Sequence, residues 1–330
     1  MVEMLVTLAL LSLIVLALMS VFNSTQAAFR ASLTETDILE SGRNAMELMA
    51  DDLAQMTPSY GTNLNMLRGY PLSYVNGYIY QNAAPPVNFY ANANYVPGGG
   101  GLGAYYQPLV QALPATAVQR TNLLENFFIL SRQNVNGSPS WVGTGYVVDP
   151  LSWPTNSLYR FVMTTSLYRS VVRTNVMDGN PAALFANFIY AVNNGADNSF
   201  TNTAYWSHLM DGVVALTVTP YDPNGLAMTN TVEYNYNGTT KTFTNTYFAP
   251  VVRQPYLTPA LQVYGFYMFS NTVPASVEVN LGVVEDAVLQ RAEGLPSATA
   301  QMNYLSNHVG QVHLFRQRVW IRNVDPTAYQ

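Results

Sequence analysis

The hydrophobic pattern of the chain changes sharply near its start. After Glu3, residues 4–22 carry no charge, no Pro and no Gly, and only Thr7, Ser12 and Ser20 are polar. As a helix rising 1.5 Å per residue, this run is about 28 Å long, close to the ~30 Å hydrocarbon core of a bilayer. The pattern predicts a membrane-spanning helix. A secretory signal peptide, which would carry a positive n-region, and an ordinary anchor with basic flanks are the alternatives.

The pattern becomes amphipathic beyond the apolar run. Residues 29–56 contain no Pro, and apolar side chains recur in steps of three and four, which places them on one helix face. Thr57-Pro58 ends the pattern, so one helix over 1–57 would be about 85 Å long. We expect its apolar face to pack on the rest of the chain through Leu39, Met46, Met49, Leu53 and Met56.

The remaining residues predict a head rich in short strands. Asn237-Gly238 is a strong hairpin signal, and helices are expected at 182–192 and 297–307. The predicted fold class is α+β, with the long helix 1–57 packed on an antiparallel head, 58–330. Strands are expected at 126–131, 145–149, 158–165, 231–236, 241–247, 261–269, 276–284 and 312–322.

Residues 58–115 are rich in Asn, Tyr, Pro and Gly and predict a flexible loop insertion in the head. The glycine run at 97–103 marks its most flexible point. A phosphate-binding loop would need a preceding strand and a following Lys-Ser/Thr, and the sequence offers neither. A mobile loop is therefore the favoured interpretation.

Composition narrows the function. The 330 residues are 49% hydrophobic and only 10% charged, with no Cys and a net charge of −5. Such a chain folds, but packing and not disulfides must hold its core. The negative net charge argues against a general nucleic-acid binder.

Candidate chemistry is sparse. His208, His308 and His313 are joined by no Cys or clustered acid, and no nucleophile motif occurs. Oxygen-bearing loops at 178–180 and 197–198 could hold Ca²⁺, although turn formation is their favoured role. We expect no enzyme activity, no metal site and no cofactor beyond this Ca²⁺ alternative.

One C-terminal strand carries a candidate ligand or partner face. Arg316, Arg318, Trp320 and Arg322 alternate along 312–322 and would share one side of the strand. A solvated face with arginine stems over Trp320 is the favoured interpretation. A partner-facing or nucleic-acid surface is the alternative.

An acid followed directly by an uncharged apolar helix, Val2-Glu3-Met4-Leu5-Val6-Thr7-Leu8, resembles the start of type IV pilins and of the pseudopilins of type II secretion. Gly145-Tyr146 followed by Leu158-Tyr159-Arg160 resembles the "GY…LYR" segment of J-type minor pseudopilins and PilW-like minor pilins. Further similar segments, in the same order as in those proteins, are 43–55 with Asp51-Asp52-Leu53, 211–225 and 273–279. Residues 315–326 are similar to prepilin-like proteins encoded in a cassette in verrucomicrobial genomes.

The resemblance implies a non-enzymatic minor pilin or pseudopilin that assembles at or near the tip of a type II secretion pseudopilus or a type IV pilus-like filament. It implies an inner-membrane helix, a periplasmic or filament-borne head, and a prepilin-type N-terminal methylation motif. The implied partners are other pilins, the inner membrane, the prepilin peptidase and the assembly platform, with no nucleic acid. A tip adhesin or a DNA-uptake minor pilin that binds a ligand through its head is the alternative.

The resemblance also implies assembly residues at the start of the helix, namely Glu3, Met4, Leu5 and Leu8. In the family, the acid pairs with the N-terminal amine of a neighbouring subunit and sets the axial register. The alternative role for Glu3 is a first-turn acid that complements the helix dipole.

The family's mature chains carry this Glu in fifth place, whereas here it is third. We therefore expect the true start to lie upstream of Met1. In-frame translation of the preceding nucleotides should give Phe or a similar residue two places before Met1, preceded by Gly and a short leader rich in Lys and Arg. An in-frame stop codon immediately before Met1 would contradict this expectation.

Overall fold

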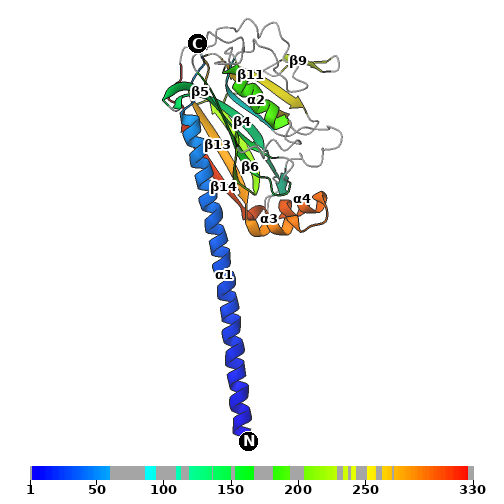
Figure 1. Ribbon diagram of the computed structural model, residues 1–330. Coiled ribbons are helices and arrows are strands. Elements are labelled where there is room, and N and C mark those ends of the chain that lie inside the picture. Colours follow the sequence, from blue (N-terminus) through cyan, green and yellow to red (C-terminus); the bar gives the residue numbers. More distant parts are fainter. Residues whose placement is uncertain are drawn as a thin grey trace.

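The long helix and a β-rich head are the two parts of the computed structural model (Figure 1). Helix α1 (Val2–Ala54) is one rod whose first half projects away from the head and whose second half lies along it. The described residues are 2–59, 86–93, 109–112, 119–135, 137–149, 153–166, 181–193, 204–228, 233–236, 239–242, 251–257, 262–269 and 271–325.

The first half of α1 is suited to a membrane. Residues Val6–Gln26 have a mean hydropathy of 2.4, and none of this segment is buried against the rest of the chain. By length and composition the helix can cross a bilayer, although a signal sequence would share both properties. The predicted continuous helix is confirmed, and it ends at Ala54.

The head contains a seven-stranded sheet and a three-stranded sheet, both antiparallel. The large sheet has the order β11 (Val251–Leu257), β12 (Gln262–Phe269), β1 (Val87–Ala93), β4 (Glu125–Val135), β5 (Ser138–Val148), β6 (Leu158–Ser166) and β7 (Trp206–Met210). The small sheet has the order β14 (Val312–Trp320), β13 (Ser276–Val284) and β8 (Val213–Tyr221). Two hairpins, β2 (Leu109–Ala112) with β3 (Gln119–Asn122) and β9 (Glu233–Tyr236) with β10 (Thr239–Thr242), complete the described strands.

The α+β class and both predicted head helices are confirmed. Helix α2 (Ala182–Asn193) packs against the large sheet, and α4 (Ala298–Asn307) begins at Ser297, whose hydroxyl accepts from the backbone N–H of Ala300. The hairpin predicted around Asn237-Gly238 is present as the β9–β10 pair. Helix α3 (Asp286–Glu293) and the 3₁₀ turn η5 (Val309–Gln311) were not expected from the sequence.

The prediction that 58–115 is wholly a loop insertion is wrong for Val87–Ala93, because β1 lies inside the large sheet, and for Leu109–Ala112, because β2 pairs with β3. Strand β1 is buried on both sides, so no two-residue alternation reveals it. Its buried Asn88 breaks the apolar pattern, and the side chain is satisfied by the carbonyl of Thr272 (2.9 Å) and the N–H of Ser59 (3.1 Å). The glycine run at 97–103 lies outside the described residues.

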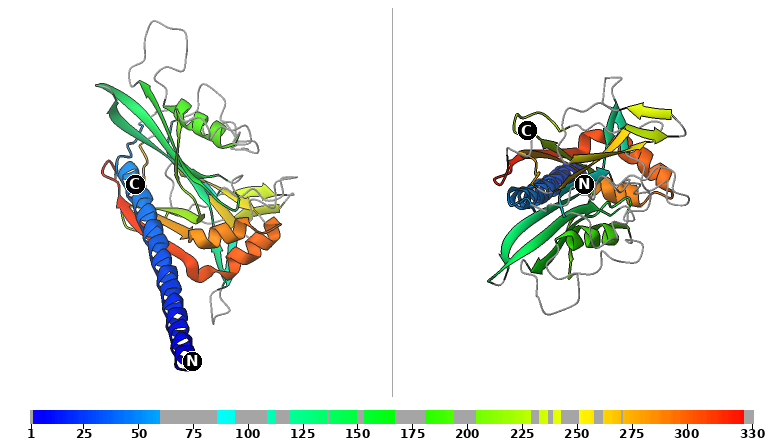
Figure 2. Two further views of the ribbon diagram at one scale, coloured as in Figure 1. Left: turned by 60° about the horizontal axis from the view of Figure 1, so that its bottom comes forward. Right: turned by 90° about the horizontal axis from the view of Figure 1, so that it is seen from above.

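The second half of α1 lies between the two sheets. Figure 2 (right) shows the blue helix with the red and orange strands of the small sheet on one side and green strands of the large sheet on the other. Met46, Met49, Leu53 and Met56 are buried in a single core cluster with side chains from both sheets. The main hydrophobic core of the head is thus built around the helix.

Leu39 was predicted to join this packing and does not, because its side chain is 39% exposed. Ile38, 4% exposed, is buried in its place. At 100° per residue, Leu39 lies about 70° from the centre of the buried stripe and Ile38 only about 30°. A pattern of steps of three and four does not resolve that difference.

The two sheets are also joined directly, where β4 begins beside β8. The N–H of Leu216 donates to the carbonyl of Leu123 (2.8 Å), and the N–H of Val218 donates to the Glu125 carboxylate (2.6 Å). Desolvation raises the pKa of Glu125 to about 7, although the hydrogen bond from Val218 opposes the rise. The side chain of Glu125 in this link between the sheets therefore stays protonated up to near-neutral pH.

Gly42 provides a test of helix docking. A Cβ atom at this position would lie 2.3 Å from Cε2 of Phe315 on β14. We expect Gly42→Val to destabilise the chain by about 1–3 kcal/mol, because the ring must leave its place against α1. Denaturant unfolding of the full chain in detergent micelles measures the change.

The matched control is Gly310→Ala, since a Cβ atom there has no neighbour within 4 Å. Adding Phe315→Leu to Gly42→Val should recover part of the loss. Equal unfolding midpoints for wild type and Gly42→Val would show that α1 does not dock as described.

Candidate assembly site on the long helix

The start of α1 presents the predicted assembly residues to the surroundings. The side chains of Glu3, Met4 and Leu8 are exposed, whereas the side chain of Leu5 lies outside the described part. Glu3 lies in the first turn of the helix. The structure therefore places these residues where a lipid or a second molecule can reach them.

The exposed part of α1 is apolar all around. The large side chains that the structure describes between Met4 and Phe22 are more than half exposed, and Phe29 is 65% exposed. A helix that is apolar on every side is stable only in an apolar environment, in lipid or among other helices. The exposed surface thus requires a covering that the described part of the chain does not supply.

Three hydroxyls in this segment are compatible with such an environment. Thr7 donates to the carbonyl of Met4 (3.0 Å), Ser12 to that of Ala9 (2.8 Å) and Thr25 to that of Val21 (2.8 Å). Each of these hydroxyl protons is satisfied within the helix, as a bilayer or a helix bundle demands. Among the described residues, the carboxylate of Glu3 has no hydrogen-bond or ion-pair partner.

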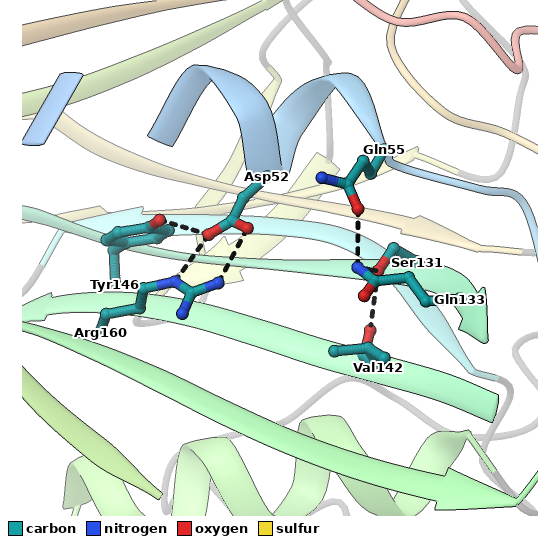
Figure 3. Close-up of polar contacts among 7 residues, drawn as sticks. All are labelled: Asp52, Gln55, Ser131, Gln133, Val142, Tyr146 and Arg160. Atoms are coloured by element: carbon teal, nitrogen blue, oxygen red, sulfur yellow. Dashed lines mark hydrogen bonds and ion pairs between the residues drawn. The ribbon is translucent and has the colours of Figure 1, made fainter. Parts of the chain in front are cut away.

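The opposite end of α1 is fixed to the head by a buried ion pair (Figure 3). Nε and Nη2 of Arg160 lie 2.7 and 2.9 Å from the two oxygens of Asp52, in a bidentate arrangement. The hydroxyl of Tyr146 donates to the same carboxylate. The Asp52 side chain is only 8% exposed, so α1, β5 and β6 meet at a charge shielded from water.

Electrostatics hold Tyr146 and Arg160 each in one protonation state. Burial raises the pKa of Tyr146, and the negative charge of Asp52 raises it further, so the phenol remains a neutral donor. Burial alone would lower the pKa of Arg160, but the hydrogen bonds and charge of Asp52 outweigh it and raise that pKa. The cluster is therefore a compensated ion pair with a phenol donor attached.

Backbone and amide contacts continue the attachment past the helix end. Met56 forms an antiparallel bridge with Ser131, and the N–H of Thr57 donates to the carbonyl of Leu130 (2.9 Å). The amide of Gln133 donates to the side-chain oxygen of Gln55 (2.8 Å; Figure 3). The chain thus passes from α1 directly alongside β4.

A residue from the C-terminal segment fixes the same point. The side-chain amide of Asn323 donates to the carbonyl of Met56 (3.0 Å) and contacts the hydroxyl of Thr57 (3.3 Å). The end of α1 is therefore held from the large sheet and from the segment after β14.

Asp52, Tyr146 and Arg160 lie in three separate segments of the sequence, and no pattern in them singled these residues out as a site. One signal was available, because Asp52 is a carboxylate next to the apolar stripe of α1, and a buried charge needs a partner. The identity of that partner was not readable, since Arg160 is 108 residues away.

The structure brings three of the four predicted face residues together on β14. Arg316 forms an ion pair with Glu278 (2.8 Å), and Nε of Arg318 donates to the hydroxyl of Ser276 (2.8 Å). The Arg318 guanidinium lies over Tyr221 (3.9 Å) and near the Trp320 ring (5.1 Å). Arg322 is exposed but lies in a turn beyond the end of the strand.

The three histidines lie at separate places. His208 contacts Asp211 (2.8 Å), Nδ1 of His308 donates to the carbonyl of Tyr304 (2.6 Å), and His313 contacts Glu285 (3.3 Å). The described ranges contain no group of three His, Cys, Asp or Glu residues that could hold a metal ion. The candidate Ca²⁺ loops at 178–180 and 197–198 lie outside these ranges.

Comparisons with protein-family models, with characterised proteins and with solved structures found no match to this chain. Its function is therefore inferred from the geometry of the helix and its attachment.

The buried ion pair gives a sign-specific prediction. Arg160→Met should destabilise the chain by about 2–4 kcal/mol, because the Asp52 carboxylate loses its buried counter-charge while the partly exposed site moderates the cost. Adding Asp52→Asn should regain stability, since the new amide side chain is neutral and its oxygen can still accept from Tyr146. Denaturant unfolding of the full chain in detergent micelles measures both.

Arg132→Met is the matched control, because Arg132 is exposed on β4 and forms no ion pair with the described residues. It should change stability little. If Arg160→Met and Arg132→Met behave alike, the cluster at Asp52 does not fix the helix to the head.

Proposed function

We propose that the chain is a non-enzymatic, membrane-anchored assembly subunit of the minor pilin or pseudopilin type. The observation that carries the proposal is the continuity of α1. One unbroken helix begins with a carboxylate, runs through an exposed, wholly apolar segment and ends clamped inside the head. A helix used only as an anchor has no need of such rigid continuity with its head.

The role proposed for Glu3 follows from the cost of an uncompensated charge in an apolar bundle. Pairing with the terminal amine of a neighbouring subunit would remove that cost and set the axial register of the two helices. A charge that only complements the dipole of its own helix would give no register. The two roles differ in whether loss of Glu3 affects assembly.

The role proposed for the Asp52 cluster is to transmit position. If neighbouring helices fix the height of α1 in a bundle, a rigid attachment fixes the height and rotation of the head as well. The bidentate contact of Arg160 with Asp52 and the bridge from Met56 to Ser131 supply such an attachment at the helix end.

The proposed location is the bacterial inner membrane, with a single pass and the head in the periplasm or on a filament. The proposed partners are other pilins, the prepilin peptidase and an assembly platform of a type II secretion or type IV pilus-like system. The head, which spans 58–330, is large for a subunit that must repeat at every step, so we place it at or near a tip.

A second candidate is a tip adhesin or DNA-uptake minor pilin. The exposed Trp320 next to the half-buried Arg318 favours it, because aromatic and guanidinium groups bind many ligands. Salt-dependent DNA binding by the full chain would support this alternative.

Replacement of Glu3 tests the assembly role. We expect Glu3→Ala to leave membrane insertion and the folded head intact, because residues 4–22 still span a bilayer. Cross-linking to other filament subunits should fall, since a desolvated pair contributes about 1–3 kcal/mol. Glu293→Ala, at an exposed acid on α3 of the head, is the matched control. Cross-linking of Glu3→Ala at wild-type yield would count decisively against the pairing.

Subunit counting tests the tip placement. Quantitative mass spectrometry of purified filaments should find this chain at low copy number, together with one or two other minor subunits. The placement is wrong if this chain is the most abundant subunit.

A further inference from the structure

The outer side of the small sheet exposes apolar side chains that a free head surface would not need. Leu314, Arg316, Arg318 and Trp320 follow one another on one side of β14. The side chain of Leu314 is 60% exposed and that of Trp320 is 65% exposed. The opposite side of the strand, with Phe315 and the buried Val319, packs toward α1. We call the side with Leu314, Arg316, Arg318 and Trp320 the outer β14 face.

Exposed apolar groups in the head gather here. In the described part of the head, the large hydrophobic side chains with high exposure are Tyr205, Leu226, Leu314 and Trp320. The turn that carries Leu226 borders the outer β14 face. A Cβ atom added at Gly225, the residue before Leu226, would lie 3.9 Å from Nη2 of Arg318. Three of these four side chains therefore lie on or beside one face. Clustered exposure of this kind marks a contact surface.

The charge of the face selects an acidic partner. Arg316 is paired with Glu278, whose pKa is lowered by the hydrogen bond from Arg316. Arg318 is half-buried, with a hydroxyl and two aromatic rings as neighbours, and its Nη2 atom is buried without an acceptor among the described residues. A guanidinium next to an exposed Trp fits a carboxylate with apolar groups beside it.

The orientation of the face selects a partner that stands beside the chain. Strand β14 lies alongside α1 (Figure 1), and the outer β14 face is turned away from the helix, because Phe315 on the opposite side of the strand lies against Gly42. A second protein anchored in the same membrane can reach it with a segment parallel to α1. The exposed side of α1 itself shows what such a segment can carry. Among its described side chains over residues 34–51, one exposed arginine, Arg43, lies with the exposed acids Glu35, Asp37, Glu40, Glu47 and Asp51.

We propose that the outer β14 face binds the acidic exposed side of the long helix of an adjacent membrane-anchored subunit. A carboxylate of that helix contacts Arg318, and its neighbouring apolar groups cover Trp320 and Leu314. That the partner is a subunit of the same filament rests on the proposed function. Nucleic acid is disfavoured, because several phosphate contacts are needed, Arg316 is already paired and the chain carries a net charge of −5.

The test places a photoreactive benzoylphenylalanine at position 320 of the full chain, in membranes of cells that make it natively. The matched control carries the same group at position 205, where Tyr205 is 41% exposed beside β7 of the other sheet. We expect position 320, but not 205, to cross-link to an Asp- and Glu-rich helical peptide of another anchored subunit. Arg318→Glu should lower this yield at least fivefold, whereas Arg132→Glu, at an exposed arginine on β4, should not.

A charge exchange makes the test specific. Replacing the cross-linked acid of the partner with Lys should restore the yield of Arg318→Glu. Arg318→Gln is the second variant, used in case Arg318→Glu disturbs the fold. Its side chain can still donate to Ser276, and its cross-linking yield should lie between those of the wild type and Arg318→Glu. Cross-links only to lipid or nucleic acid, a partner peptide without acids, or a yield unaffected by Arg318→Glu would each overturn the inference.

The outcomes separate this inference from the proposed function. If the chain is present in filaments but position 320 gives no acidic cross-link, only the surface assignment fails. If the acidic cross-link forms but the chain never copurifies with filaments, only the filament assignment fails. A cross-link to α1 of a second copy would support the surface and contradict the low copy number.

Discussion

The carboxylate of Asp52 is the constraint on which the attachment of helix to head depends. It lies on the side of α1 that enters the core, where an uncompensated charge would be costly. Arg160 and Tyr146 satisfy it from two neighbouring strands, which fixes the helix both in rotation and along its axis. An apolar side chain at this position would tolerate sliding by a fraction of a turn, whereas a bidentate pair does not.

The two halves of α1 lie in different environments, although they form one continuous helix. In the first half, the hydroxyls of Thr7 and Ser12 bond to the helix's own backbone, and the apolar side chains are not buried by the described chain. The second half is enclosed by two sheets whose inner sides supply most of the core cluster. Since the helix has no break between the halves, any displacement at one end reaches the other as a rigid movement.

Local signals predicted α1, α2 and α4 but not α3, because each signal depends on residues near in sequence. The apolar run at 4–22, the helix expected at 297–307 and the Asn237-Gly238 hairpin signal all led to elements that the structure contains. Strand β1 was not predicted from the sequence, because both its sides are buried and Asn88 interrupts its apolar residues. The Asp52 cluster escaped because pairing between β5, β6 and α1 brings together groups about a hundred residues apart, and no local pattern encodes such a meeting. Leu39 was misplaced because periodicity gives a helix face only to within a residue.

The position of α1 at the start of the chain has a consequence for the order of folding. Just after the helix, the carbonyl of Met56 accepts a hydrogen bond from Asn323, 267 residues later. Within the helix, Gly42 lies against the ring of Phe315 on β14. The helix is thus synthesised first and enclosed last. Until β14 is complete, the Met-rich stripe stays open on one side, and closing so long a loop is slow. Between the synthesis of α1 and that of β14, the packing site of the helix on the head is incomplete, and during that interval the chain is most exposed to proteolysis and to mispairing with other helices.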